Sequence, residues 1–80
     1  SGVWFTYDGT VIKVLQAKPL SGHYGPAGQM GFTDADPLII SCKEGALAIQ
    51  KLQRPGARPL AIDEFLRGYN FKGLNPRTRN

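Results

Sequence analysis

Few residues in this sequence are of types that take part in acid–base, nucleophilic or metal chemistry. It contains one histidine, His23, and one cysteine, Cys42. An acid–base enzyme usually combines a histidine with carboxylates or a nucleophile, but His23 lies in a glycine-rich segment where a flexible loop position is an equally good interpretation. One Cys and one His cannot supply the four ligands of a structural zinc site. The composition therefore argues against a complete enzyme and favours a binding or accessory module.

The other chemically capable groups have simpler interpretations. Asp34 and Asp36 resemble part of a metal loop, but no further acids follow at the required spacing, so we expect no metal site. Cys42 stands beside Lys43, and a buried small hydrophobe is a simpler interpretation than a reactive thiol. A single cysteine excludes an internal disulfide framework and fits a reducing compartment. The glycines of residues 19–37 lack the Lys–Ser/Thr pair of a phosphate-binding loop, and a bend that crosses a sheet is the better interpretation.

The charge distribution is the first positive indication of function. Residues 1–40 carry two lysines against three acids, a net charge of −1, whereas residues 41–80 carry eight Lys and Arg against three acids, a net charge of +5. A basic half in a chain of pI about 9.6 suggests a polyanion partner. Solubility alone is the alternative, since a net charge of +4 is ordinary for a small domain.

Length and composition predict one small domain. The 80 residues are 41% hydrophobic and 20% charged, as in soluble globular chains. The longest apolar stretch is far shorter than the about 20 residues of a membrane-spanning helix, so we expect neither a signal peptide nor a membrane partner. The chain opens at Ser1 without an initiator Met, which we interpret as a piece of something longer. We expect a monomer whose core covers about residues 3–72, followed by a flexible basic tail over 73–80.

The elements that must position these residues are mainly strands. Val3–Tyr7 and Val11–Leu15 flank an Asp-Gly turn and predict a hairpin. Trp4, Phe5, Val11, Ile12 and Val14 are most simply core residues, with base stacking as the alternative role for Trp4 or Phe5.

A second hairpin is predicted by Leu38–Cys42, a Lys-Glu-Gly turn and Ala46–Gln53. Residues 29–32 predict one further short strand. Leu52 departs from the alternation of Leu47 and Ile49, and a β-bulge near residues 50–51 would return it to the core side.

Residues 61–67 form the one convincing helix pattern, with acids in the first turn, Arg67 in the last, and Gly68 at the position of a left-handed C-cap. Such a short helix needs to dock on the sheet to persist. We therefore predict a mainly β fold: a small, open, Greek-key β-barrel of five or six strands with one short C-terminal helix.

Three segments, taken in order, resemble the C-terminal domain of methionyl-tRNA formyltransferases. They are Trp4-Phe5-Thr6-Tyr7-Asp8-Gly9 with Ile12-Lys13-Val14 and Ala17; Cys42 through Ile49 with Leu52-Gln53; and Glu64-Phe65-Leu66-Arg67-Gly68. The sequence departs from this family at Ala61, where a capping Ser is usual, and at Lys43-Glu44, where Gly-Asp is usual. The ending after Phe71 does not align.

The resemblance implies an open barrel related to the OB-fold that follows a catalytic domain in the same parent chain. It implies that this domain holds initiator tRNA by a basic surface, while the catalytic domain transfers a formyl group from 10-formyltetrahydrofolate. No catalytic residue, cofactor or metal is expected in this chain, which alone should be inactive. The implied location is the cytoplasm, or mitochondria in a eukaryotic source.

Two alternatives remain at this point. The domain could instead be a structural flank of the substrate cleft in another folate-dependent formyltransferase or hydrolase, of the sugar-nucleotide or formyltetrahydrofolate dehydrogenase type, or a general protein-interaction module. For the RNA-positioning role, the candidate phosphate-binding residues share a positive charge and predicted exposure. They are Lys13, Lys43, Lys51, Arg54, Arg58, Arg67 and Lys72, with the tail arginines Arg77 and Arg79 behind them.

Overall fold

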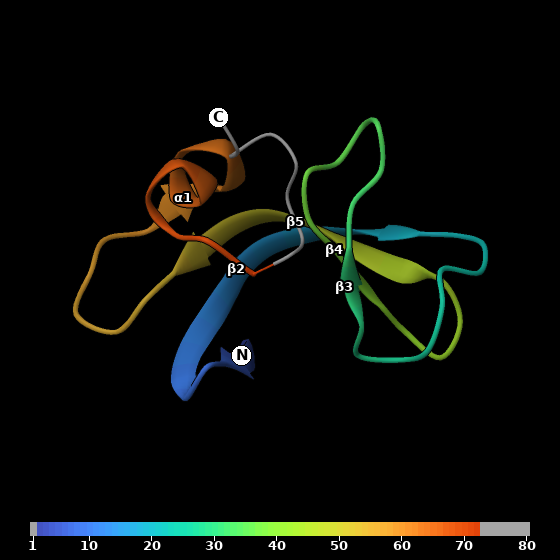
Figure 1. Cartoon of the computed structure of the whole chain (residues 1–80), viewed down its shortest axis with the longest axis horizontal. Helices are drawn as coiled ribbons and strands as arrows, with labels where there is room; N and C mark the ends of the chain where they lie inside the picture. The colour runs from blue at the N-terminus through green and yellow to red at the C-terminus, as the bar shows by residue number, and fades with distance from the viewer. Residues whose placement is uncertain (1, 73–80) are drawn as a thin grey trace.

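The computed structural model describes residues 2–72, which form six strands and one helix (Figure 1). Every strand pair is antiparallel, and the strand order is β1-β2-β5-β4-β3 with β6 beside β5. The bounds are β1 (Val3–Tyr7), β2 (Thr10–Leu20), β3 (Met30–Gly31), β4 (Ile39–Ser41), β5 (Ala46–Gln53), β6 (Leu60–Ala61) and α1 (Ile62–Gly68).

The topology is an open Greek key. Strands β3, β4 and β5 pair in succession, and β2 lies on the other side of β5 after a long connection over residues 21–29. Strands β1 and β3 stand at opposite ends of the strand order, so the sheet does not close into a barrel. The predicted mainly β, open fold with one short helix is confirmed.

The first hairpin forms because its turn residues accept a left-handed backbone. Asp8 and Gly9 have φ values of 52° and 79°, as a two-residue type I′ turn requires, and Tyr7 pairs with Thr10 across it. Strand β2 then continues to Leu20, well beyond its predicted end at Leu15.

The predicted β-bulge is present in β5, where this strand pairs with β2. Ala17 pairs with Ile49 and Gln16 with Lys51, so Gln50 is the extra residue on β5. Ile49 and Leu52 therefore both reach the main core, at 1% and 0% exposure.

The connection between β2 and β3 crosses β4. The Gly28 N–H donates to the Ser41 carbonyl (2.8 Å), the Ser41 N–H donates to the Gln29 carbonyl (2.8 Å), and the Ser41 hydroxyl donates to the Tyr24 carbonyl (3.1 Å). The Gln29 N–H also donates to the Pro26 carbonyl (3.2 Å), and Gly25 and Gly28 have positive φ, so the chain bends in this glycine-rich stretch as expected. Tyr24 and Leu20 pack there on a small second cluster made of Ile39, Ala46 and Ala48.

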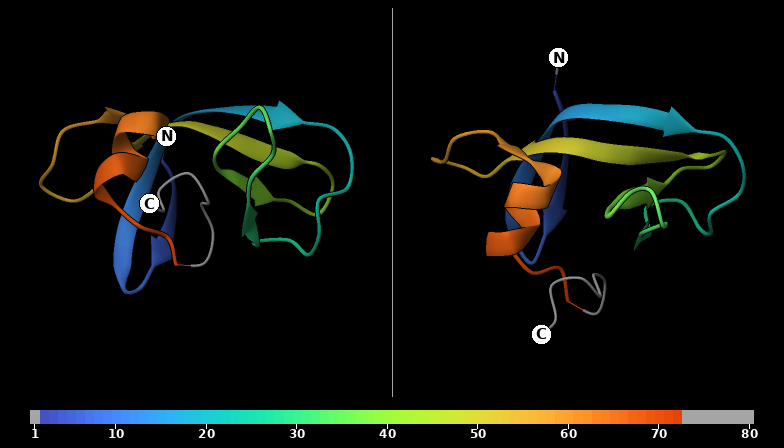
Figure 2. Two further views of the ribbon diagram at one scale, coloured as in Figure 1. Left: turned by 45° about the horizontal axis from the view of Figure 1, so that its top comes forward. Right: turned by 90° about the horizontal axis from the view of Figure 1, so that it is seen from above.

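The main core lies between α1 and one face of the long strands. Figure 2 shows α1 and the β3–β4 pair on the same side of β2 and β5. The core contains Ile12, Leu38, Ile49, Leu52, Ile62, Phe65, Leu66 and Phe71. Phe71, from beyond the helix, packs its ring edge-on against Tyr7, with centroids 4.8 Å apart, and the Lys72 N–H donates to the Tyr7 hydroxyl (2.7 Å). The segment after α1 is thereby bound to β1.

The missing N-cap hydrogen bond of α1 was predicted correctly, but the C-cap was not. Ala61 occupies the N-cap with no side-chain hydrogen bond, as the loss of the usual Ser implies. The expected left-handed C-cap at Gly68 is wrong: Gly68 is the last helical residue and has no positive φ. Tyr69 instead adopts extended backbone (φ −143°), which lets its ring pack against Phe65 and Phe71. No helix among the described residues is long and apolar enough to span a bilayer.

The predicted core also needs correction at two positions. Trp4 is 60% exposed and Val11 is 43% exposed. Their neighbours Phe5 and Ile12 face the core, and the alternation of side chains along a strand therefore directs Trp4 and Val11 to the opposite face.

Candidate nucleic-acid interface

Three lysines share the face of the sheet that lies opposite the main core. Lys13 stands between the inward-facing residues Ile12 and Val14, Lys18 follows inward-facing Ala17, and Lys51 precedes buried Leu52. Side-chain alternation places all three on this opposite side of β1, β2 and β5, which we call the outer face. Each of the three is exposed.

The outer face is positive because the acids lie elsewhere. Strands β1, β2 and β5 contain no Asp or Glu. The six acidic residues of the chain are found in turns and in α1: Asp8, Asp34, Asp36, Glu44, Asp63 and Glu64. Separation of the two signs by element gives this face a local positive potential that the modest net charge does not reveal.

Lys18 was missing from the predicted site. The sequence predicts that the second strand ends at Leu15, which would place Lys18 outside the sheet. In the structure, Lys18 pairs with Ala48 in the middle of the β2–β5 ladder. Two successive register shifts around Gln16 preserve the sheet beyond the predicted strand end, and the pattern of hydrophobic residues gives little sign of this continuation.

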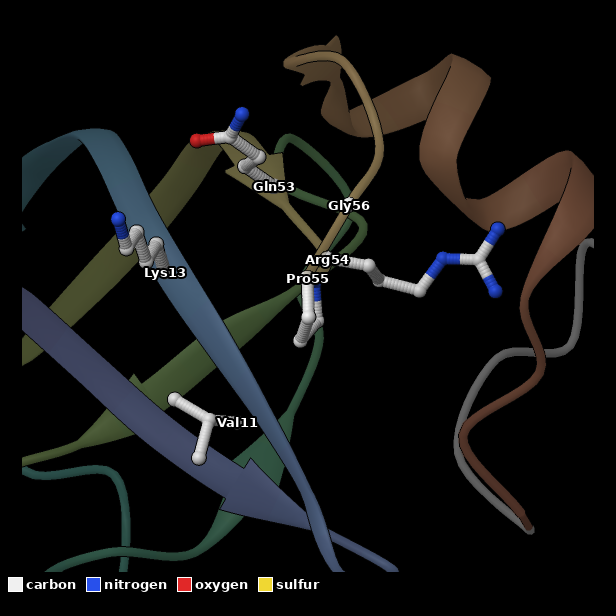
Figure 3. A pocket seen from close by; sticks show the side chains of 6 residues that line it. All are labelled: Val11, Lys13, Gln53, Arg54, Pro55 and Gly56. Carbon is white, nitrogen blue, oxygen red and sulfur yellow. The ribbon is translucent and has the colours of Figure 1, made fainter.

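A row of side chains crosses the outer face at Lys13. Lys13 pairs with Trp4 on β1 and with Gln53 on β5. Beside Lys13 is a shallow pocket of about 260 Å³ (Figure 3), which is lined by Val11, Lys13, Gln53, Arg54, Pro55 and Gly56.

A turn fixed by hydrogen bonds forms the far wall of this pocket. The Ala57 N–H donates to the Arg54 carbonyl (3.1 Å), and Gly56 has a φ of 73°, as expected for a turn with Pro followed by Gly. The Gln53 side-chain Nε2 donates to the Ala57 carbonyl (2.9 Å). Gln53 therefore holds the turn against the end of β5.

Arg54 leaves the outer face although its backbone borders the pocket. Figure 3 shows its side chain extended away from Lys13 and toward α1. The guanidinium carbon lies 5.2 Å from the ring centroid of Tyr69 and 5.9 Å from that of Phe65, within the range of cation–π attraction. Arg54 thus packs on the helix side, next to a second hollow of about 450 Å³ lined by Thr10, Arg54, Pro55, Ala57 and Tyr69.

The remaining predicted cations are exposed but scattered. The Arg58 guanidinium lies 3.5 Å from the Glu64 carboxylate, Arg67 is in the last turn of α1, and Lys72 follows Phe71. Lys43 is in the β4–β5 turn, at the opposite end of β5 from Arg54. Because a strand rises about 3.3 Å per residue, the eight residues of β5 separate Lys43 from Arg54 by roughly 25 Å. Of the seven described candidates, the structure gathers Lys13 and Lys51 on the outer face. Arg77 and Arg79 lie outside the described residues.

The acids, the cysteine and the histidine lie outside this face, in turns, in loops and in α1. The Thr33 hydroxyl accepts hydrogen bonds from the N–H groups of Ala35 (3.2 Å) and Asp36 (3.0 Å), so the acidic segment is an ordered turn. Within residues 2–72, no three His, Cys, Asp or Glu residues are grouped as metal ligands. Cys42 is half-buried, and His23 is exposed in the loop that follows β2.

Comparison with known proteins gives a consistent family. The sequence model of the family described as "Formyl transferase, C-terminal domain" matches residues 1–70. Proteins named methionyl-tRNA formyltransferase match as well. One from Rickettsia rickettsii (strain Iowa) is 40% identical over 71 residues, which cover 88% of this chain and 22% of that protein.

Two further relatives carry the same name. The Aromatoleum aromaticum protein is 41% identical over 58 residues, which cover 72% of this chain and 18% of the relative. The Rickettsia australis protein is 41% identical over 69 residues, which cover 85% of this chain and 90% of the relative. The chain therefore spans about a fifth of the length of the Rickettsia rickettsii and Aromatoleum aromaticum proteins.

Proposed function

This chain belongs to the formyl transferase C-terminal domain family, and we propose that it is the RNA-binding accessory domain of a methionyl-tRNA formyltransferase. In this role it positions the initiator methionyl-tRNA, while a separate catalytic domain of the same parent chain performs N-formylation with 10-formyltetrahydrofolate. The names of its relatives support the parent activity. The proposal assigns this chain no catalytic step.

The observation that carries the RNA-binding part is the acid-free outer face. Lys13, Lys18 and Lys51 project from neighbouring strands β2 and β5, with no carboxylate on either strand to neutralise them. Lysine ammonium groups attract phosphates as point charges, and phosphate contacts fix the orientation of a nucleic acid without reading its sequence. A sheet that holds three such groups on one side is suited to orienting a tRNA relative to a second domain.

The test is the binding of the chain to initiator tRNA over a series of salt concentrations. Each phosphate contact releases counterions, so three contacts predict a slope of log K against log salt of roughly −2 to −3. Duplex DNA and a neutral sugar nucleotide serve as controls. Binding of tRNA with this slope, and no binding of the neutral sugar nucleotide, would support the proposal. Absence of tRNA binding at low salt would contradict it and favour the structural-flank alternative, and the duplex DNA control measures how much of the affinity phosphates alone supply.

A further inference from the structure

The outer face combines its lysines with the only tryptophan of the chain. Building on the proposed function, we propose that Trp4 is a base-stacking residue, which packs its indole on an unpaired base of the RNA while Lys13 binds the adjoining phosphate. The two residues are direct cross-strand partners, and Lys13 is in turn paired with Gln53. Residues paired across an antiparallel ladder have Cβ atoms about 5 Å apart, which suits simultaneous contact with one nucleotide.

The described residues leave most of the Trp4 side chain uncovered. Phe5 packs with Phe71 in the core, so strand alternation leaves Trp4 on the outer face, where it is 60% exposed. Val11 and Leu15, at 43% and 45% exposure, are nearby on β2. A large aromatic side chain left in water beside other exposed apolar groups marks an interaction site rather than a packing residue.

Charge decides the class of partner. The centre of a protein–protein interface is depleted of charged residues, whereas here Lys13 is adjacent to Trp4 in the register, with Lys18 and Lys51 on the same face and no acid on the three strands. Aromatic rings on a positively charged sheet are the arrangement that holds single-stranded nucleic acid, since every base offers a π-face and every nucleotide a phosphate. The outer face is therefore complementary to RNA.

The stacking role also specifies which part of an RNA is bound. Bases inside a double helix are stacked on one another and are not open to a side chain, whereas bases in ends, loops and bulges are. Trp4 consequently confers a preference for unpaired nucleotides, and the three lysines alone would bind paired and unpaired segments alike.

The fluorescence of Trp4 tests this directly because the chain has no other tryptophan. The chain is titrated with a labelled single-stranded RNA oligonucleotide and with a blunt RNA duplex of the same length. Label anisotropy gives the affinity, and tryptophan emission reports stacking. We expect the single strand to quench Trp4 emission in step with binding, and the duplex to bind without comparable quenching.

Two substitutions and a matched control complete the test. Trp4→Ala should weaken single-strand binding about tenfold, within the range for loss of one stacked base, with the salt slope and duplex affinity unchanged. Trp4→Phe should retain most of the affinity. Phe32→Ala removes a comparably exposed aromatic (48%) outside β1, β2 and β5 and should have no effect. Because Trp4 is outside the core, circular dichroism should show all three variants folded.

The outcomes separate this inference from the proposed function. Salt-dependent binding without quenching, or an equal loss for single strand and duplex in Trp4→Ala, would overturn the stacking role and leave the lysine-based proposal standing. Absence of binding to both RNAs at low salt would overturn both, and would favour an outer face covered by another protein domain.

Discussion

Arg54 packs on aromatic rings near the helix and contributes to stability through this contact. In the sequence it appeared equivalent to six other basic residues predicted to bind RNA. In the structure its guanidinium stacks near Tyr69 and Phe65, whereas Arg58 has a side chain that is 76% exposed and a single long contact with Glu64. Exposed ion pairs of this kind contribute little to stability, while a cation over aromatic rings contributes measurably.

Substitution of these two arginines should therefore have different effects on folding. Arg54→Ala is expected to lower the free energy of unfolding by about 0.5 to 1 kcal/mol through loss of the cation–π contacts. Arg58→Ala, the matched control, should change it by less than about 0.5 kcal/mol. Urea denaturation of both variants measures the difference, and equal effects would argue against a structural role for Arg54.

Helix α1 shows how an element can be stable without good local signals. It has seven residues and no N-cap hydrogen bond, so isolated it would not persist. Three of its residues, Ile62, Phe65 and Leu66, are buried in the main core, and the segment after it adds Tyr69 and Phe71 to the same aromatic cluster. Docking on the sheet therefore replaces capping as the main source of stability.

Restoring the cap should add stability to this element. Ala61 already has the extended backbone of an N-cap (φ −61°, ψ 152°) and an exposed side chain. In Ala61→Ser the hydroxyl can accept a hydrogen bond from a free N–H of the first turn, which is expected to raise the free energy of unfolding by about 1 kcal/mol.

Thermal unfolding provides the measurement, since a gain of this size corresponds to an increase of roughly 4–8 °C in Tm for a domain of this length. Ala57→Ser, at an exposed turn position with no helix to cap, is the control. If Ala61→Ser gains no more than Ala57→Ser, the helix end does not limit stability.

At the scale of the whole molecule, the sequence predicted the two hairpins and their turns, because the Asp-Gly and Gly45 turns have strong local signals. The bulge at Gln50 could also be predicted, since Leu52 broke an otherwise regular alternation. Trp4 could not be placed, because Val3, Trp4 and Phe5 are all apolar and give no alternation to read. Phe71 has no periodic neighbours, and its burial depends on contacts with residues far earlier in the chain.

The candidate site was less predictable than the fold for a related reason. Charge asymmetry along the chain pointed to the second half, but the lysines of the outer face come from both halves. Lys13 and Lys18 belong to residues whose summed charge is negative. Only the sheet, which pairs β2 with β5, gathers them with Lys51 on one acid-free surface.

The most direct measurement compares two variants of equal net charge for binding to initiator tRNA. One replaces Lys13, Lys18 and Lys51 by Gln, and the other replaces Lys43, Arg58 and Lys72 by Gln. Because each variant loses three positive charges, general electrostatic attraction falls equally, and a difference reports the location of the contacts. We predict that the outer-face variant loses most of the salt dependence and affinity, while the scattered-charge variant retains most of both. Equal losses, or a larger loss in the scattered-charge variant, would contradict an RNA-binding outer face.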